Sequence, residues 1–183
     1  MNRPCLLAAL ALVAALTGGC TGVPEGLAPV TGFELDRYLG RWHEIARLDH
    51  SFERGLVDVT AEYRRRPDGR VDVVNRGYDP KAGRWKEANG VARFAGAPDV
   101  GSLEVTFFGP FWGGYNILVL DPAYRHALVA GPNRDYLWIL AREPKVDAAT
   151  LAALVDKARG WGFDTAALIY VPQGTAPPQA AAR

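Results

Sequence analysis

The sequence predicts an all-β protein: an eight-stranded antiparallel up-and-down barrel with one C-terminal α-helix packed outside it and a short final strand. Three observations predict this fold. Apolar and polar residues alternate through most of residues 56–142, short turns separate the alternating segments, and one helical pattern follows them. Alternation with a period of two is typical of a half-buried strand, whereas an apolar stripe with a period of about 3.6 is typical of a surface helix.

Residues 56–66 show the alternation most clearly, because Val57, Val59, Ala61 and Tyr63 share one face and polar residues take the other. Short turns rich in Pro, Asp and Gly join neighbouring segments, which indicates an antiparallel meander. Eight strands are about the number at which a barrel closes around space for one small ligand. The other seven predicted strands are 42–48, 70–77, 84–95, 102–107, 115–120, 126–130 and 136–142.

A single amphipathic helix is predicted after the strands. Asp147 is a suitable N-cap, and Gly160 and Gly162 end the pattern. The apolar stripe covers only one face, so the helix should pack against the outer wall of the barrel. Residues 167–171 are then expected to form the last short strand. The stripe consists of Leu151, Leu154, Val155 and Ala158.

Length and composition indicate one ordinary globular domain. The chain has 183 residues, of which 49% are hydrophobic and 22% charged, and its formal net charge is +1. This charge gives no sign of nucleic-acid binding, which needs a basic patch or stripe. The only cysteines are Cys5 and Cys20, so no disulfide can stabilise the folded body.

The N-terminus has the pattern of an export signal. A positive start precedes the apolar run 6–16, which is too short to span a bilayer as a helix but suits a signal peptide. Small residues leading into Cys20 resemble the bacterial lipobox, although Leu16 lies one place early. We therefore expect residues 1–19 to be a lipoprotein signal peptide and Cys20 to be lipidated. The alternative is an ordinary signal peptide and a free exported thiol.

Two segments flank the predicted barrel domain, which spans residues 32–173. Residues 20–31 contain Pro24, Gly26 and Pro29 and are expected to form the lipidated N-terminus and an extended tether. Residues 174–183 are expected to be a disordered tail. By resemblance to bacterial lipoproteins, a Thr rather than an Asp after Cys20 favours the outer membrane, where the protein would face the periplasm.

Three local motifs occur in the order and spacing of the lipocalin family. Gly40 and Trp42 match the G-x-W at the entry of the first strand, Asp121 and Tyr124 match the second motif, and Arg142 matches the third. One G-x-W alone would be weak evidence. All three together on an eight-strand pattern strongly resemble a lipocalin.

The resemblance runs from about residue 33 to residue 171, and stretches 108–111 and 131–140 resemble bacterial outer-membrane lipoprotein lipocalins in particular. It implies that Trp42 plugs the closed end of the barrel and that Arg142 lies across its ring. These signature residues would then hold the barrel shut rather than bind a ligand.

The inward positions of such a barrel would line a cavity for an acyl chain. The ligand that the resemblance implies is a fatty acid or a lysophospholipid, held for storage or transport in envelope maintenance. Plain core filling is the alternative for each inward residue. The expected cavity set is Val57, Val59, Ala61, Tyr63, Val73, Leu103, Val105, Phe107, Tyr115, Ile117, Tyr136 and Trp138; the expected rim is Asn75, Arg76, Arg93 and Trp112.

Catalysis is not expected. The mature chain has no thiol nucleophile beyond Cys20, and His43, His50 and His126 have no partner at metal-ligand spacing. We therefore expect no catalytic residue, no metal and no cofactor. Two other readings stay open: an enzyme that acts on a bound lipid, and a structural envelope protein without a ligand. The aromatic loop 107–112 could instead contact the membrane or a second subunit in a homodimer.

Overall fold

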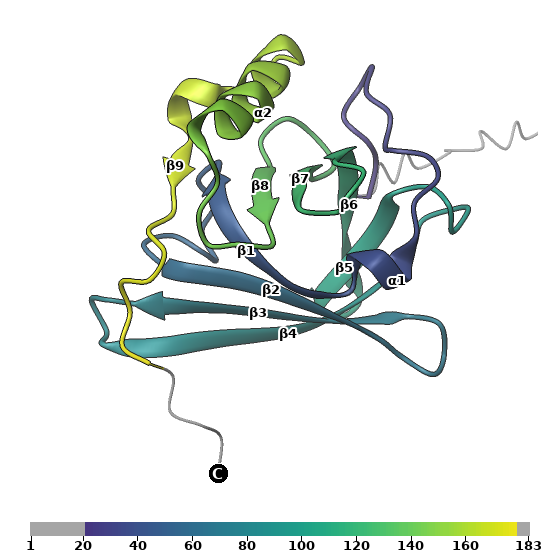
Figure 1. The fold of residues 1–183 in the computed structure, drawn as a ribbon. Coiled ribbons are helices and arrows are strands. Elements are labelled where there is room, and N and C mark those ends of the chain that lie inside the picture. The colour runs from purple at the N-terminus through teal and green to yellow at the C-terminus, as the bar shows by residue number, and fades with distance from the viewer. Residues whose placement is uncertain (1–20, 179–183) are drawn as a thin grey trace, which may run out of the picture.

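A closed antiparallel β-barrel forms the body of the protein (Figure 1). The computed structural model describes residues 21–178, so the expected signal peptide and Cys20 lie outside the described residues. Eight strands pair in chain order, and β1 closes the barrel by pairing with both β8 and β2. The strands are β1 (Gly40–Arg47), β2 (Val57–Arg65), β3 (Val71–Asp79), β4 (Arg84–Phe94), β5 (Ser102–Phe108), β6 (Phe111–Leu120), β7 (His126–Ala130), β8 (Leu137–Ala141) and β9 (Ile169–Tyr170).

The predicted fold class is therefore confirmed, and the helix lies where it was expected. Helix α2 (Ala148–Gly160) begins after Asp147, whose side chain accepts a hydrogen bond from the Thr150 backbone N–H at 2.9 Å. Two short helices, α1 (Leu35–Tyr38) and η1 (Thr165–Ala167), were not predicted. None of the helices in residues 21–178 has both the length and the apolar character needed to span a membrane.

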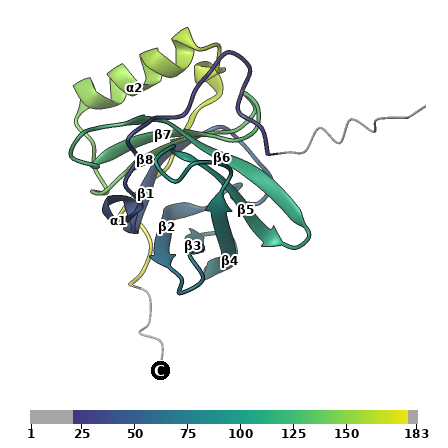
Figure 2. The ribbon, with the colours of Figure 1, turned by 90° about the vertical axis from the view of Figure 1, so that its right-hand side faces the viewer.

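Two apolar clusters lie on opposite faces of the barrel wall. The first fills part of the barrel interior and includes Trp42, Tyr63 and Ile117. The second lies between α2 and the outer faces of β1, β7 and β8, where Leu154 and Val155 are buried. Figure 2 shows α2 across this side of the barrel. The helix thus covers an apolar outer wall, and none of its residues belongs to the interior cluster.

The ends of the barrel differ. Helix α1 and the connections β2–β3, β4–β5 and β6–β7 lie at one end, which we call the closed end. The connections β1–β2, β3–β4, β5–β6 and β7–β8 lie at the other, which we call the open end. The segment between the predicted strands 102–107 and 115–120 was expected to be a loop, but β6 begins at Phe111, and only Gly109 and Pro110 join it to β5.

The segment expected to be a free tether packs on the barrel wall from Thr21 onward. The Val30 N–H donates to the Ile117 carbonyl at 2.9 Å, and Asn116 Nδ2 donates to the Gly22 carbonyl at 2.9 Å. Pro24 is fully buried. Apolar contacts and backbone hydrogen bonds therefore fix this segment on the barrel, although its Pro- and Gly-rich composition predicted an extended tether.

The C-terminal segment closes the barrel where β1 and β2 separate. Gln173 Nε2 donates to the carbonyls of Glu44 on β1 and Val59 on β2, at 2.8 and 3.2 Å. Residues 174–176 then donate to the Asp58 carboxylate, including the Thr175 N–H at 3.0 Å. The expectation of a disordered tail from residue 174 thus differs from the structure for residues 174–178.

Candidate functional site: the barrel interior

The closed end is plugged as the resemblance implied. The Arg142 guanidinium carbon lies 4.0 Å from the centroid of the Trp42 ring, and Trp42 is fully buried. Arg142 also donates to the carbonyls of Arg41 and Arg37, at 2.9 and 2.8 Å. Gly40 has a φ of +90°, a conformation that favours glycine, and this brings its backbone against the guanidinium.

The second motif holds the neighbouring loop. The Asp121 carboxylate accepts hydrogen bonds from the backbone N–H groups of Arg125 and His126. The Tyr124 hydroxyl accepts one from the Glu34 N–H at 2.9 Å, which ties the loop to the start of α1. All five signature residues therefore act at the closed end, where they hold backbone segments together.

Three tyrosines form the floor of the interior above Trp42. The Tyr115 hydroxyl lies 2.6 Å from that of Tyr38 and 2.8 Å from that of Tyr63. Burial raises the pKa of all three phenols, so the groups stay neutral and share their protons. The floor is therefore polar at three oxygens but carries no charge.

Most of the expected cavity residues do face the interior. Four of them are buried in the interior cluster and five are partly exposed there. A side chain that faces the inside of a barrel and still reaches solvent shows that the interior is not fully packed. The buried ones are Tyr63, Val73, Leu103 and Ile117; the partly exposed ones are Ala61, Val105, Phe107, Tyr115 and Trp138.

Three expected cavity residues do not pack in the interior cluster. The β2–β3 register shifts between Val57 and Thr60, so Val57 pairs with Tyr78 on the outer face instead of pointing inward. Val59 shares the inward face of Ala61, but it packs in a separate small cluster with Leu56 and Val171. Tyr136 precedes β8, and its ring stacks on Trp138 at the open end. A single extra residue reverses the face of every later position, which alternation alone cannot reveal.

The four rim candidates divide between two faces. Asn75 faces the interior, and its buried Oδ1 has no hydrogen-bond partner. Arg76 lies on the outer wall and pairs with Glu87 at 2.7 Å. Arg93 also lies outside, where it pairs with Glu104 at 2.7 Å and covers the Trp112 ring at 4.1 Å. Arg76, Arg93 and Trp112 therefore do not surround the mouth as expected.

Sequence reasoning missed a buried charged cluster in the open half of the interior. Arg47 donates to the Glu44 carboxylate at 2.6 Å and to the Glu53 carbonyl at 2.7 Å. His50 Nε2 lies 2.9 Å from Glu53 Oε2, and Trp138 Nε1 donates to the same oxygen at 3.2 Å. Each of the four titratable side chains is at most 8% exposed. We call Glu44, Arg47, His50 and Glu53 the polar cluster.

A β-bulge explains why the cluster was missed. Glu44 and Arg47 are three positions apart, and regular alternation would place them on opposite faces. The β1–β8 register shifts between Glu44 and Ala46, so Ile45 and Ala46 both face α2 while Glu44 and Arg47 both face inward. Glu44 lies two positions after Trp42 and so shares its face under regular alternation, but no sequence signal marks the bulge that also turns Arg47 inward.

Burial and neighbouring charges shift the two carboxyl groups in opposite directions. Burial raises the pKa of Glu44 well above its usual value, and the nearby Glu53 carboxylate adds to this. Burial acts in the same sense on Glu53, but its contacts with His50, Trp138 and Arg47 outweigh it and lower the pKa. The arrangement favours a protonated Glu44 beside an ionised Glu53.

The wall opposite the polar cluster is lined by small residues. The register places Ala88 opposite Asn75 and Gly113 opposite Val105, both on the inner face. A Cβ added to Gly113 would have only the Val105 carbonyl oxygen within 4 Å, at 3.9 Å. The β4–β6 wall therefore leaves room beside the tyrosine floor.

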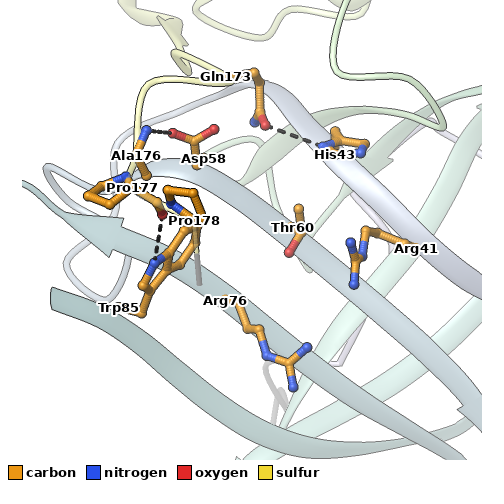
Figure 3. Close-up of a pocket in the computed structure, with 10 residues that line it drawn as sticks. All are labelled: Arg41, His43, Asp58, Thr60, Arg76, Trp85, Gln173, Ala176, Pro177 and Pro178. Atoms are coloured by element: carbon orange, nitrogen blue, oxygen red, sulfur yellow. Dashed lines mark hydrogen bonds between the residues drawn. The ribbon is translucent and has the colours of Figure 1, made fainter. Parts of the chain in front are cut away.

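Two surface pockets lie outside this interior. One, of about 260 Å³, lies on the outer wall between Arg41, Thr60 and Arg76 and is bordered on one side by Pro177 (Figure 3). The other, of about 290 Å³, lies beside Phe33 and Tyr124 at the closed end. Within residues 21–178, no three His, Cys, Asp or Glu side chains are grouped so that they could hold a metal ion.

Residues 33–173 match the family model of the lipocalin-like domain. The chain belongs to the lipocalin-like family. It is 52% identical to outer membrane lipoprotein Blc of Vibrio cholerae, covering 90% of this chain and 96% of the relative. It is 49% identical to Blc of Escherichia coli K12, covering 91% and 96%.

The lipocalin fold extends well beyond the bacterial relatives. The chain is 36% identical to temperature-induced lipocalin-1 of Arabidopsis thaliana, covering 82% of this chain and 84% of the relative. The solved structure of insecticyanin from the tobacco hornworm has a TM-score of 0.66 at 22% identity, covering 85% and 88%. Family and fold together make this protein a lipocalin-type binder of hydrophobic ligands.

Proposed function

We propose that this lipocalin is a membrane-anchored carrier that holds a fatty acid or a lysophospholipid in its barrel. One observation supports the proposal most directly: apolar side chains face the interior and remain partly exposed there, among them Val105, Phe107 and Trp138. An apolar enclosed wall with a few polar groups is typical of a site for a hydrophobic small molecule.

Chain burial would supply most of the affinity. Each buried methylene contributes about 0.8 kcal/mol, so a long acyl chain outcompetes a short one without any specific contact. The three phenols at the floor stay uncharged and can contact a chain end without the cost of burying a charge. The wall thus favours a single long chain over a bulky polar molecule.

Displacement of a fluorescent fatty acid tests this proposal. We expect palmitate to displace the probe more strongly than laurate, and laurate more strongly than octanoate, with affinity rising up to about fourfold per methylene. A flat response across chain lengths, or no displacement, would contradict the carrier function and favour a structural envelope role. Native mass spectrometry of gently extracted protein would identify the lipid that co-purifies.

The proposed location is the periplasmic face of the outer membrane, where the protein would serve envelope maintenance. The sequence around Cys20 and the name of the Blc relatives, outer membrane lipoprotein, support this. Thr21 and Gly22 pack against Gly114, so the anchor would hold the barrel close to the bilayer. If Cys20→Ala leaves the mature protein in the membrane fraction, the anchor is wrong.

Homodimerisation is the second proposal about partners. Phe108 and Phe111, at the β5–β6 turn, are 80% and 78% exposed, which would suit contact with a second subunit. Sedimentation of the wild type and of the double variant Phe108→Ser, Phe111→Ser checks this. A dimer that persists in the double variant would exclude this turn as the interface.

We propose a binding role without catalysis. The three histidines lie apart: His43 faces the outer pocket, His50 belongs to the polar cluster, and His126 begins β7. An enzyme acting on a bound lipid is the alternative. Incubation with lysophospholipid followed by mass spectrometry separates the two, because hydrolysis would release a free fatty acid.

A further inference from the structure

The polar cluster is unusual because charged side chains are buried inside an apolar barrel. Arg47 is 1% exposed and Glu44 3%, although burying an ion is unfavourable unless partners compensate for its lost hydration. The signature residues at the closed end already shut the barrel without this cluster. Barrel closure therefore does not explain why these charges are inside.

Apart from His50 Nε2, which lies 2.9 Å from Glu53 Oε2, two nitrogens of the cluster lack hydrogen-bond partners among the described residues. Arg47 Nε is buried and unpaired, while the other two nitrogens of the guanidinium are used. His50 Nδ1 is also buried and unpaired, and the His50 side chain is 4% exposed. Both residues contact Glu53, Arg47 at its backbone carbonyl and His50 at its carboxylate, so both side chains belong to the same cluster. Leaving a buried donor unpaired is costly, because the group has lost its hydration without gaining a partner.

We propose that the polar cluster is the head-group subsite of the barrel, which binds the anionic oxygen acid at the end of an acyl chain through Arg47 and His50. The inference rests on the proposed function, because it requires an acyl chain in the interior. A carboxylate and a phosphate share the chemistry that fits, namely charged oxygens that accept hydrogen bonds from a guanidinium.

The charges around the site are compatible with one anion. The lowered pKa of Glu53 favours its ionised form, which would balance Arg47, while the raised pKa of Glu44 favours the neutral acid, which can itself donate a hydrogen bond. Tyr63 on β2 also lies near the two carboxyls, and burial raises its pKa, so it is a neutral phenol. Glu44 therefore does not need to repel the head group.

The position of the cluster also fits. It occupies the open half of the interior, where Trp138 contacts Glu53 and the His50 ring packs 4.0 Å from Phe52. Phe52 is 62% exposed, so the cluster lies just beneath the surface of the open end. A chain extending from it toward the tyrosine floor would run along the small-residue wall at Gly113.

Isothermal titration with three ligands tests the subsite: palmitate, palmitoyl lysophosphatidic acid and hexadecanol, which lacks the acid. Arg47→Met should weaken binding of at least one acid ligand about tenfold or more, and of hexadecanol less than about threefold. Loss of palmitate alone assigns the site to fatty acids, and loss of lysophosphatidic acid alone assigns it to lysophospholipids. Thermal melts verify that each variant is folded.

Two further variants serve as controls for Arg47→Met. Arg41→Met removes an arginine from the outer face of the same strand and should change no affinity. Glu44→Gln imitates the neutral acid and should bind palmitate at least as tightly as the wild type. If Arg47→Met does not fold, Arg47→Lys replaces it, because it keeps the charge but lacks Nε; palmitate should still weaken more than hexadecanol.

The outcomes separate this inference from the carrier function. Equal losses for acid and alcohol ligands in the Arg47 variants would overturn the head-group subsite but leave the acyl carrier standing. Weaker palmitate binding by Glu44→Gln would also overturn it, since the cluster would then require an ionised Glu44. If the wild type binds none of the three ligands, both proposals fail.

Discussion

The closed and open halves of the barrel interior are built on different physical principles. At the closed end, Trp42 and Arg142 are paired with backbone carbonyls and aromatic rings until no polar group is left over. In the open half, charged side chains are buried with two nitrogens unpaired, beside a wall of small residues. The comparison teaches that the hydrogen-bonding groups of the closed half all have partners, which stabilises the fold. The open half instead has buried nitrogens without partners and space that side chains do not fill.

The largest expected effect comes from breaking the closed half. Trp42→Ala should lower the free energy of unfolding by about 3–5 kcal/mol, because it removes a fully buried ring and the surface that Arg142 covers. Urea denaturation measures this. Trp112→Ala, on the outer wall, should cost less than about 1 kcal/mol. If both variants lost a similar free energy of unfolding, Trp42 at the closed end would be no more important for stability than Trp112 on the outer wall.

The second prediction concerns how Arg142 holds the plug. Arg142→Lys keeps a positive charge but cannot donate to the three carbonyls of Tyr124, Arg41 and Arg37, so we expect a loss of about 1–3 kcal/mol. Arg93→Lys is the matched control, because Arg93 covers Trp112 with similar geometry on the exposed outer wall. If both variants unfold at the same urea concentration as the wild type, hydrogen bonding at the closed end contributes little.

The sequence predicts the closed half better than the open half, for a physical reason. Trp42, Asp121 and Arg142 belong to the three motifs that resemble the lipocalin family, and that resemblance implied the closed barrel end with Arg142 across the Trp42 ring. The polar cluster depends on the bulge that turns both Glu44 and Arg47 inward. An extra residue in one strand leaves no periodic signal, so a reading based on strict alternation necessarily fails beyond it.

The terminal segments show the same limit. Composition predicted a loose tether and a disordered tail, since Pro, Gly and Ala give no periodic pattern. The structure shows Pro24 buried and residues 174–176 bonded to Asp58. Asp58 has a φ of +52° in a shifted register, a local geometry that alternation did not anticipate. What holds both segments is tertiary contact, which local sequence does not encode.

The third prediction uses pH to probe the open half. The folded protein holds the Glu44 proton more tightly than the unfolded chain does, because its pKa is raised above 4.5. The contribution of Glu44 to the free energy of unfolding should therefore fall as the pH rises above this value. The variant Glu44→Gln has no such group to ionise. The stability of this variant relative to the wild type should therefore increase between pH 5 and pH 8, a range that lies above the usual glutamate pKa of about 4.3. A relative stability independent of pH would mean that Glu44 ionises in the fold without penalty.

The smallest change in stability should accompany a large change in binding. Gly113→Leu places a side chain where only the Val105 carbonyl oxygen lies within 4 Å, and it replaces glycine within a strand, so stability should change by less than about 1 kcal/mol. The leucine would occupy the space beside the tyrosine floor, and palmitate affinity should fall about tenfold or more, as a clash with two or more buried methylenes implies. The control is Glu104→Leu, which adds an apolar side chain nearby but on the outer face, where Glu104 pairs with Gly114. Gly69→Leu would not serve, because Gly69 has a φ of +82° and a leucine there would strain the backbone. If Gly113→Leu binds palmitate as well as the wild type, the acyl chain does not run along the β5–β6 wall. The ligand would then not occupy the space beside Gly113 that distinguishes the open half from the closed half.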